Sequence, residues 1–176
     1  MLLFPIWNSG GNCNDKRNLW KKFNGTLDDY GTFIISGRGD MKNLKWDEGT
    51  TSIGDYAFAY CANLTSVEIP HSVAVIGEWA FYHYHGLYHI VLPYGVKVLC
   101  SFSFSDCKNL ISVDLSDSVT NIVSLSFNDC TRLQNVTIPD SIISIGNDIF
   151  YHCTNLPEKF FESFLNALVA KNWRIN

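Results

Sequence analysis

Histidines and aspartates are the first side chains in this sequence whose types and spacing could bind a metal. His83 and His85 lie close together, with His89 nearby, and imidazole nitrogens are common metal ligands. Asp106 and Asp129 recur at intervals of 23 between His83 and His152, where their carboxylates could attract a cation.

The alternative interpretation of these residues is an ordinary turn, because Asp, Asn and His are common there. If residues 23 apart are stacked at about 4.8 Å, His83 and His152 are separated by about 15 Å, too far to share one ion. We favour the turn, and the sequence therefore predicts no metal and no cofactor.

Four cysteines also recur in register, and they are Cys61, Cys107, Cys130 and Cys153. Stacked at about 4.8 Å, the last three would lie within disulfide range by Cα distance alone. Parallel side chains are poorly aimed at each other, however, and a buried cysteine behaves as a small hydrophobe. Reduced, packed thiols are the interpretation that we favour, and a disulfide or a metal ligand remains the alternative.

The sequence shows no constellation typical of catalysis. His152 and Cys153 are neighbours along the chain, and adjacent side chains point in different directions. No serine-triad signature, phosphate-binding loop or HExxH motif is present. We expect a protein without enzymatic activity.

All these side chains belong to a repeat of 23 residues. Complete copies begin at Thr51, Ala74, Lys97 and Thr120, and a fifth starts at Ile143 and runs to Leu156. The invariant column of the repeat consists of Phe58, Phe81, Phe104, Phe127 and Phe150. A second column consists of Ile53, Ile76, Leu99, Ile122 and Ile145. Such a period with Leu-rich spacing predicts a leucine-rich-repeat solenoid.

Each copy contains a segment with the pattern of a strand. Val67 and Ile69 lie two residues apart and share one face, which leaves Ser66 and Glu68 on the other. Successive copies are predicted to stack as a parallel sheet, with the phenylalanine column as a structural spine. Stacking is required because one copy cannot bury enough apolar surface to offset the entropy of ordering 23 residues.

The repeat unit resembles the BspA-type (Treponema pallidum-type) leucine-rich repeat. The segment TSIGDYAFAYCANLTSVEIP, residues 51–70, matches that pattern almost position for position, and TLDDYGTFIISGRGDM, residues 26–41, resembles the β-hairpin cap that often precedes it. The resemblance implies a curved, right-handed β-rich solenoid on a secreted or cell-surface protein. Several members of this family are adhesins that bind host matrix proteins or other bacteria.

The expected organisation is a β cap with a partial first repeat over residues 1–50, five repeats over 51–156, the last one partial, and a capping helix over 157–176. Asp28 to Gly31 would form the turn of the hairpin. In the helix, Phe160, Phe161, Phe164, Leu165 and Leu168 would form one broad apolar face. The caps suggest a complete unit.

One column departs from the family pattern. Gly54, Gly77 and Gly146 follow the isoleucine column, but Cys100 and Val123 occupy the same position in the third and fourth copies. If this turn requires a positive φ, the valine should be strained and the middle of the solenoid should deviate locally.

Composition excludes several classes of function. The 176 residues carry a net charge of −4 and no long basic run, so we expect no nucleic-acid partner. No apolar run is long enough for a membrane helix, and we expect no membrane insertion.

The N-terminal MLLFPIW is too short for the core of a signal peptide and lacks a basic lead. We expect a monomer.

The solvent face of the stacked strands is the predicted recognition surface. Its centre is partly aromatic and apolar, its flanks are acidic or polar, and aromatic anchors ringed by polar groups are typical of interface hot spots. The candidate ligand-binding residues are Tyr88, His89, Val91, Ile111, Glu68, Asp114, Ser112 and Asn135. The alternative is an ordinary solvated sheet face with tolerated apolar residues.

Three functions compete. The favoured one is a non-catalytic, adhesin-like module that recognises a host or microbial protein or glycan through this face. The second is a structural scaffold or self-associating module of a larger assembly. The third is an enzyme or metal-dependent protein, which the motifs do not support.

Overall fold

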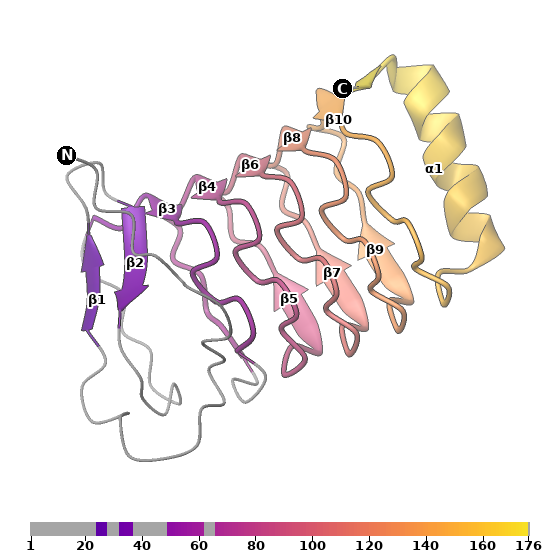
Figure 1. Cartoon of the computed structure of the whole chain (residues 1–176). Coiled ribbons are helices and arrows are strands. Elements are labelled where there is room, and N and C mark those ends of the chain that lie inside the picture. The colour runs from indigo at the N-terminus through magenta and orange to yellow at the C-terminus, as the bar shows by residue number, and fades with distance from the viewer. Residues whose placement is uncertain (1–23, 28–31, 37–48, 62–65, 176) are drawn as a thin grey trace.

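The computed structural model describes residues 24–27, 32–36, 49–61 and 66–175, and these form a solenoid of stacked coils with a helix at its C-terminal end (Figure 1). In chain order the elements are β1 (Asn24–Leu27), β2 (Thr32–Ser36), β3 (Ser52–Ile53), β4 (Val75–Ile76), β5 (His89–Val91), β6 (Val98–Leu99), β7 (Ser112–Asp114), β8 (Asn121–Ile122), β9 (Asn135–Thr137), β10 (Ser144–Ile145), α1 (Glu158–Lys171) and β11 (Arg174–Ile175). The solenoid predicted from the repeat is thereby confirmed.

Short strands from successive coils build two sheets on different sides of the solenoid (Figure 1). One sheet has the order β5-β7-β9, and every pair in it is parallel. The other has the order β1-β2-β3-β4-β6-β8-β10-β11 and runs through the isoleucine column. Paired residues such as Ile76 and Leu99 are one period apart, so the repeat in the sequence is the register of the sheets. The first sheet is the one predicted from the sequence, and the second was not foreseen.

The phenylalanine column forms a continuous stack of buried rings along the axis. From Phe58 to Phe150, neighbouring ring centroids are 4.9, 4.8, 5.4 and 5.8 Å apart, and the ring planes deviate by 15° or less. Offset aromatic pairs contribute about 0.5–1.5 kcal/mol each beyond the burial of their surface. The predicted spine is confirmed, and it links every coil to the next.

The backbone around each phenylalanine forms a further ladder between coils. Phe58 and Tyr60 donate their N–H groups to the carbonyls of Ala80 and Tyr82, at 2.6 and 2.8 Å. The residue between them, Ala59, donates within its own turn, to the carbonyl three residues back. N–H groups therefore alternate between the turn itself and the following coil, which satisfies a segment that forms neither helix nor strand.

Two positions in each of these turns have a left-handed backbone although no glycine occupies them. With φ between 54° and 62°, they are Tyr56, Trp79, Phe102, Leu125 and Asp148 in one column and Tyr60, His83, Asp106, Asp129 and His152 in the other. A left-handed conformation costs about 1–2 kcal/mol per residue. In the first four copies, the N–H group of each left-handed residue donates to the next coil, as Tyr56 does to the carbonyl of Glu78, and this bond holds the residue in that conformation.

The condition under which the valine would be strained, a positive φ in the glycine column, is not met. None of its positions, Val123 included, has a left-handed backbone. Glycine fits here for another reason, because the backbone of the preceding coil passes very close. A Cβ on Gly77 would lie 2.8 Å from the backbone nitrogen of Asp55, and one on Gly146 would lie 2.1 Å from that of Ser124. The valine therefore shows no backbone strain of the expected kind.

A hairpin covers the first coil. β1 and β2 are antiparallel, and β2 pairs in parallel with β3, which extends the larger sheet beyond the repeats. The two strands confirm the predicted cap, whereas its turn at residues 28–31 lies outside the described residues.

Helix α1 covers the last coil (Figure 1). It begins after Pro157 and ends at Lys171, and the next residue, Asn172, terminates it with a left-handed φ of 48°. Phe160 and Phe164 meet the ring of Phe150 edge-on, with centroids 5.2 and 5.6 Å apart. The chain then turns back, buries Trp173 and adds β11 beside β10.

The apolar face of α1 is narrower than the sequence predicted. Phe160, Phe164 and Leu168 pack against the core, as expected for a capping helix. Phe161 and Leu165 are exposed, because a straight helix that crosses the end of the solenoid brings only one stripe into contact.

Replacing a ring in the middle of the spine is expected to destabilise the fold strongly. Phe104→Ala removes a fully buried ring that stacks on both neighbours, and we expect a loss of about 3–5 kcal/mol in the free energy of unfolding. Urea denaturation followed by circular dichroism measures it. Tyr94→Ala, at an exposed side chain, should stay within about 0.5 kcal/mol of the parent. Equal losses in both variants would contradict the assignment of the spine.

Adjacent positions on α1 provide a matched test of the cap. We expect Phe164→Ala to lower the free energy of unfolding by roughly 1–3 kcal/mol, because it removes a half-buried ring from the end of the stack. Leu165→Ala should change it by less than about 0.5 kcal/mol, because this side chain is exposed. A larger effect at Leu165 would show that its side of the helix faces the core. Thermal or urea denaturation distinguishes the two outcomes.

Candidate functional site

Most of the recognition residues predicted from the sequence lie on the outer face of the sheet β5-β7-β9 or directly beside it. In β5, His89 and Val91 point outward on either side of the buried Ile90. The register places His89, Ser112 and Asn135 in one row. Asp114 pairs with Val91 in the next row.

The apolar centre of this face is exposed. Tyr88 is 41% exposed and Val91 65% exposed, whereas Ile111 is half-buried. The amide of Ile111 donates to the carbonyl of Tyr88 at 2.8 Å, which holds the two residues on adjacent coils. An aromatic ring and two aliphatic side chains thus occupy neighbouring positions on a hydrogen-bonded backbone.

Polar groups on the same face are linked across the strands. His89 Nδ1 lies 2.8 Å from Ser112 Oγ, and the hydroxyl of Thr137 donates to Asp114 Oδ1 at 3.3 Å. Asp114 and Asn135 remain exposed and available to a partner. The other predicted acid, Glu68, is exposed one copy earlier, but no strand is assigned to the described residues 66–70, so no strand pairing joins it to Val91.

An aromatic side chain beside this face was not among the residues predicted from the sequence. Tyr94 is 73% exposed in the turn that follows β5. It stands in a column whose other members are His71, Asp117 and Asp140. A large ring in a column of polar turn residues is a signal that could have identified it.

A row of rings along the left-handed turns was also missed. Trp79 lies between Tyr56 and Phe102, with centroid distances of 6.1 and 4.0 Å and nearly parallel planes. Trp79 and Phe102 are half-buried, and each covers a face of the other. This row therefore stabilises the turns, and Trp79 and Phe102 leave little ring surface for a ligand.

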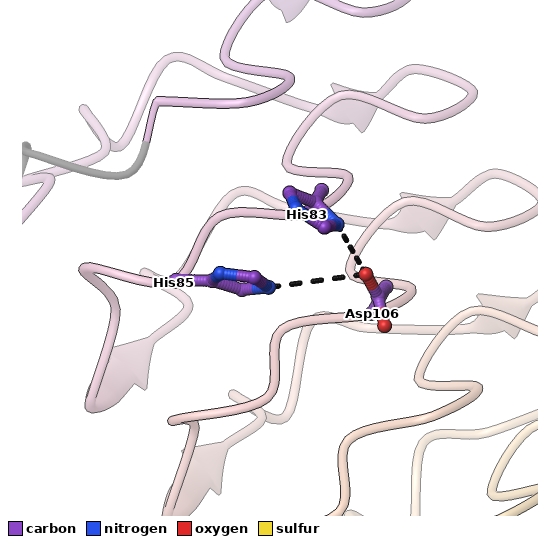
Figure 2. Close-up of side chains that lie close together, drawn as sticks. All are labelled: His83, His85 and Asp106. Atoms are coloured by element: carbon purple, nitrogen blue, oxygen red, sulfur yellow. Dashed lines mark hydrogen bonds and ion pairs between the residues drawn. The ribbon is translucent and has the colours of Figure 1, made fainter. Parts of the chain in front are cut away.

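The second left-handed column forms a series of contacts between imidazoles and carboxylates. His83 Nδ1 contacts Asp106 Oδ2, and His152 Nδ1 lies 3.0 Å from Asp129 Oδ1. As Figure 2 shows, His85 points toward Asp106 as well, with its Nε2 atom 3.8 Å from Oδ2. The sequence spacing relates His83 to the distant His152, but the residues that meet are His83, His85 and Asp106.

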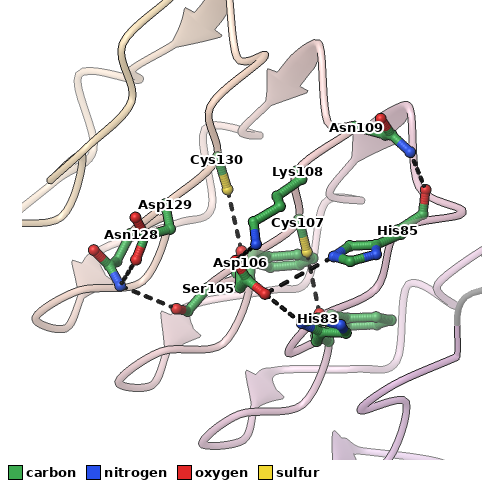
Figure 3. A network of polar contacts seen from close by, with 12 residues as sticks. His83, His85, Ser105, Asp106, Cys107, Lys108, Asn109, Asn128, Asp129 and Cys130 are labelled. Carbon is green, nitrogen blue, oxygen red and sulfur yellow. Dashed lines mark hydrogen bonds and ion pairs between the residues drawn. The ribbon is translucent and has the colours of Figure 1, made fainter.

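Neighbouring side chains hold this group in place (Figure 3). Lys108 Nζ lies 3.0 Å from the other oxygen of Asp106, and Asn109 donates its side-chain N–H to the carbonyl of His85 at 2.8 Å. Burial, aided by the charges of His83 and Lys108, lowers the pKa of His85, although Asp106 opposes the shift. The imidazole of His85 is therefore neutral at neutral pH.

The cysteine column lies inside the solenoid as free thiols. In Cys61 the Sγ atom contacts the carbonyl of Ala59 in its own coil, and in the other three members it points to a phenylalanine carbonyl in the preceding coil. The three contacts are Cys107 to Phe81 at 3.1 Å, Cys130 to Phe104 at 3.2 Å and Cys153 to Phe127 at 3.1 Å. Burial, together with the adjoining thiols, raises the pKa of Cys130 well above its usual range. The structure agrees with reduced, packed thiols, the interpretation favoured from the sequence.

Comparison with known proteins identifies the repeat. The family model described as "BspA type Leucine rich repeat region" matches residues 31–166 in six copies. A comparison with curated proteins gives no match. Over the described residues, no helix has the length and hydropathy needed to cross a bilayer.

Solved structures show the same fold. A leucine-rich repeat protein of T. pallidum is 23% identical, with a TM-score of 0.54 over 82% of this chain and 92% of its own. A leucine-rich cell surface protein of Faecalibacterium prausnitzii A2-165 is 24% identical, with a TM-score of 0.50 over 78% of this chain and 47% of its own.

The thiol column can be tested with a thiol-reactive reagent. Because the thiolate is the reactive form and Cys130 is buried with a raised pKa, Cys130→Ala should leave the number of rapidly reacting thiols in the native protein unchanged at about pH 8. After denaturation the same variant should show one reactive thiol fewer than the parent. If native Cys130→Ala instead showed one rapidly reacting thiol fewer than the native parent, Cys130 would be accessible to the reagent.

Proposed function

The chain belongs to the BspA-type leucine-rich repeat family, and we propose that it is a non-catalytic binding module that recognises its partner through the outer face of β5, β7 and β9. The observation that carries this proposal is the group of exposed Tyr88 and Val91 with half-buried Ile111, on and directly beside a sheet whose other side is packed into the core. Apolar and aromatic side chains held on a rigid backbone lose little entropy when a partner covers them.

The chemistry of the face indicates what kind of partner fits. Its centre offers apolar contacts, and exposed Asp114 with Asn135 offers hydrogen-bond acceptors at the rim. A partner with an apolar or sugar-ring surface bordered by N–H or cationic groups would be complementary. We propose a host or microbial protein or glycan as that partner.

Location follows as part of the same proposal. A structural neighbour from F. prausnitzii is described as a cell surface protein, and the match with the family is consistent with such a setting. We propose that this chain acts as an adhesin-like module that is secreted or displayed at a cell surface.

The experiment is a screen of the full chain against immobilised matrix proteins and glycans, with a double variant and a matched control. Tyr88→Ala with Ile111→Ala removes the centre of the face. Tyr56→Ala with Ile143→Ala removes a tyrosine and an isoleucine that are exposed elsewhere, at 51% and 58%. Hot-spot residues contribute at least about 2 kcal/mol, so the first double variant should bind roughly 30-fold more weakly or worse, and the control should bind as the parent does.

Circular dichroism and the melting temperature of each variant show whether the fold is kept. Loss of the fold in the Tyr88/Ile111 variant would contradict the surface assignment, and equal weakening in both double variants would place the partner elsewhere. Light scattering at several concentrations separates the alternative, a self-associating scaffold, because its mass would rise with concentration.

A further inference from the structure

Two imidazoles and one carboxylate converge across the boundary between the second and third copies of the repeat (Figure 2). His83 occupies the left-handed position of one coil, His85 follows two residues later, and Asp106 occupies the left-handed position of the next coil. One ligand atom from each of the three lies within 4.8 Å of the other two. The stacking of the coils creates this cluster from residues 21 to 23 positions apart.

His85 has a nitrogen for which the protein offers no hydrogen bond. Its Nε2 atom is buried and makes none, yet it points at Asp106 Oδ2 from 3.8 Å. The position is not the result of a loose loop, because the backbone N–H of His85 donates to the carbonyl of His83 at 3.1 Å and its carbonyl accepts from Asn109. A buried polar atom without a partner is unfavourable, and a bound ion would provide the partner.

We propose that His83, His85 and Asp106 bind a divalent transition-metal ion such as Zn²⁺ through Nδ1, Nε2 and Oδ2. Bonds of 2.0–2.2 Å in a tetrahedral site place ligand atoms about 3.4 Å apart, which is close to the present separation of His85 Nε2 and Asp106 Oδ2. The ion replaces the proton shared by His83 and Asp106, and that pair opens to admit it.

The donor set selects the class of ion. Imidazole suits zinc, copper and nickel, whereas calcium and magnesium prefer oxygen ligands throughout. The thiol of Cys107, next to Asp106 in the chain, is buried and directed at the carbonyl of Phe81, so it is not a ligand. Three protein ligands leave a coordination position for water or for a donor from another molecule.

Lys108 orients the carboxylate of Asp106 and also limits the affinity of the site for a cation. Its ammonium contacts Asp106 Oδ1, which leaves Oδ2 facing the imidazoles (Figure 3). The same positive charge repels a cation. The side chain of His83 is 34% exposed, which gives an ion access from solvent.

The chain contains its own control for this site. Asp129 and His152 make a similar contact two coils later, with the carboxylate on the earlier coil and the imidazole on the later one, and with Nδ1 and Oδ1 3.0 Å apart. In that copy, Thr154 stands where His85 stands in the second. One imidazole and one carboxylate remain, and two ligands hold an ion less tightly than three.

Isothermal titration of Zn²⁺ into the full chain, metal-stripped and without a histidine tag, tests the proposal. The variants are His85→Gln, Asp106→Asn and His83→Asn, since asparagine tolerates the left-handed backbone of positions 83 and 106. The control is His152→Asn. We expect one Zn²⁺ per chain, a higher melting temperature in its presence, and at least tenfold weaker binding in each of the three variants but not in the control.

Several results would overturn the proposal. They are the absence of saturable binding, equal weakening in His152→Asn, and binding of Ca²⁺ as tight as that of Zn²⁺. Titration with Co²⁺ adds a spectroscopic test, because a thiolate-to-cobalt charge-transfer band would place the ion on a cysteine. Circular dichroism of each variant separates loss of ligands from loss of the fold. This outcome is independent of the partner screen, since the cluster lies outside the rows of the sheet face.

Discussion

Hydrogen bonds between successive coils are the constraint on which the rest of this structure depends. Over the residues that the structure describes, a coil does not satisfy its own backbone, because its strands are two or three residues long and its turns direct alternate N–H groups along the axis. In the first four copies these N–H groups donate to carbonyls of the following coil, about one period along the chain. A change of one residue in the length of a copy would shift every donor in it. The phenylalanine stack and the cysteine column follow from the same register, since equivalent side chains are superposed along the axis.

The same dependence explains the ends of the molecule. The first and last coils have one neighbour among the repeats, and their apolar rings and strand edges need another cover. At the N-terminal side, β2 provides the missing strand beside β3. At the C-terminal side, two elements provide this cover, because α1 packs on the ring of Phe150 and β11 pairs with the edge of β10. At this end, β11 thus provides the hydrogen bonds and α1 provides the apolar cover.

Residues that point away from the axis are free of this constraint, and the candidate sites are found among them. Val91 in β5 and Tyr88 just before it are exposed, so their chemistry can serve recognition without affecting the core. The left-handed turns offer a second set of outward positions, where His83 and Asp106 meet. In both places, stacking at a constant spacing brings together residues from different copies. A solenoid therefore creates composite sites by its regularity, whereas its single copies have none.

The sequence by itself determined the period, the inward columns, the identity of the spine and the sheet face that carries Tyr88 and Asp114. Those features depend on alternation and repetition, which are properties of the order of residues. Only the tertiary structure decided the second sheet through Ile53, the left-handed turns at bulky residues and the meeting of His85 with Asp106. A two-residue strand has no alternation to detect, and a tyrosine or tryptophan gives no local sign of a positive φ. The imidazoles and the carboxylate meet because of the offset between coils, and that offset is set by packing and hydrogen bonds along the whole stack.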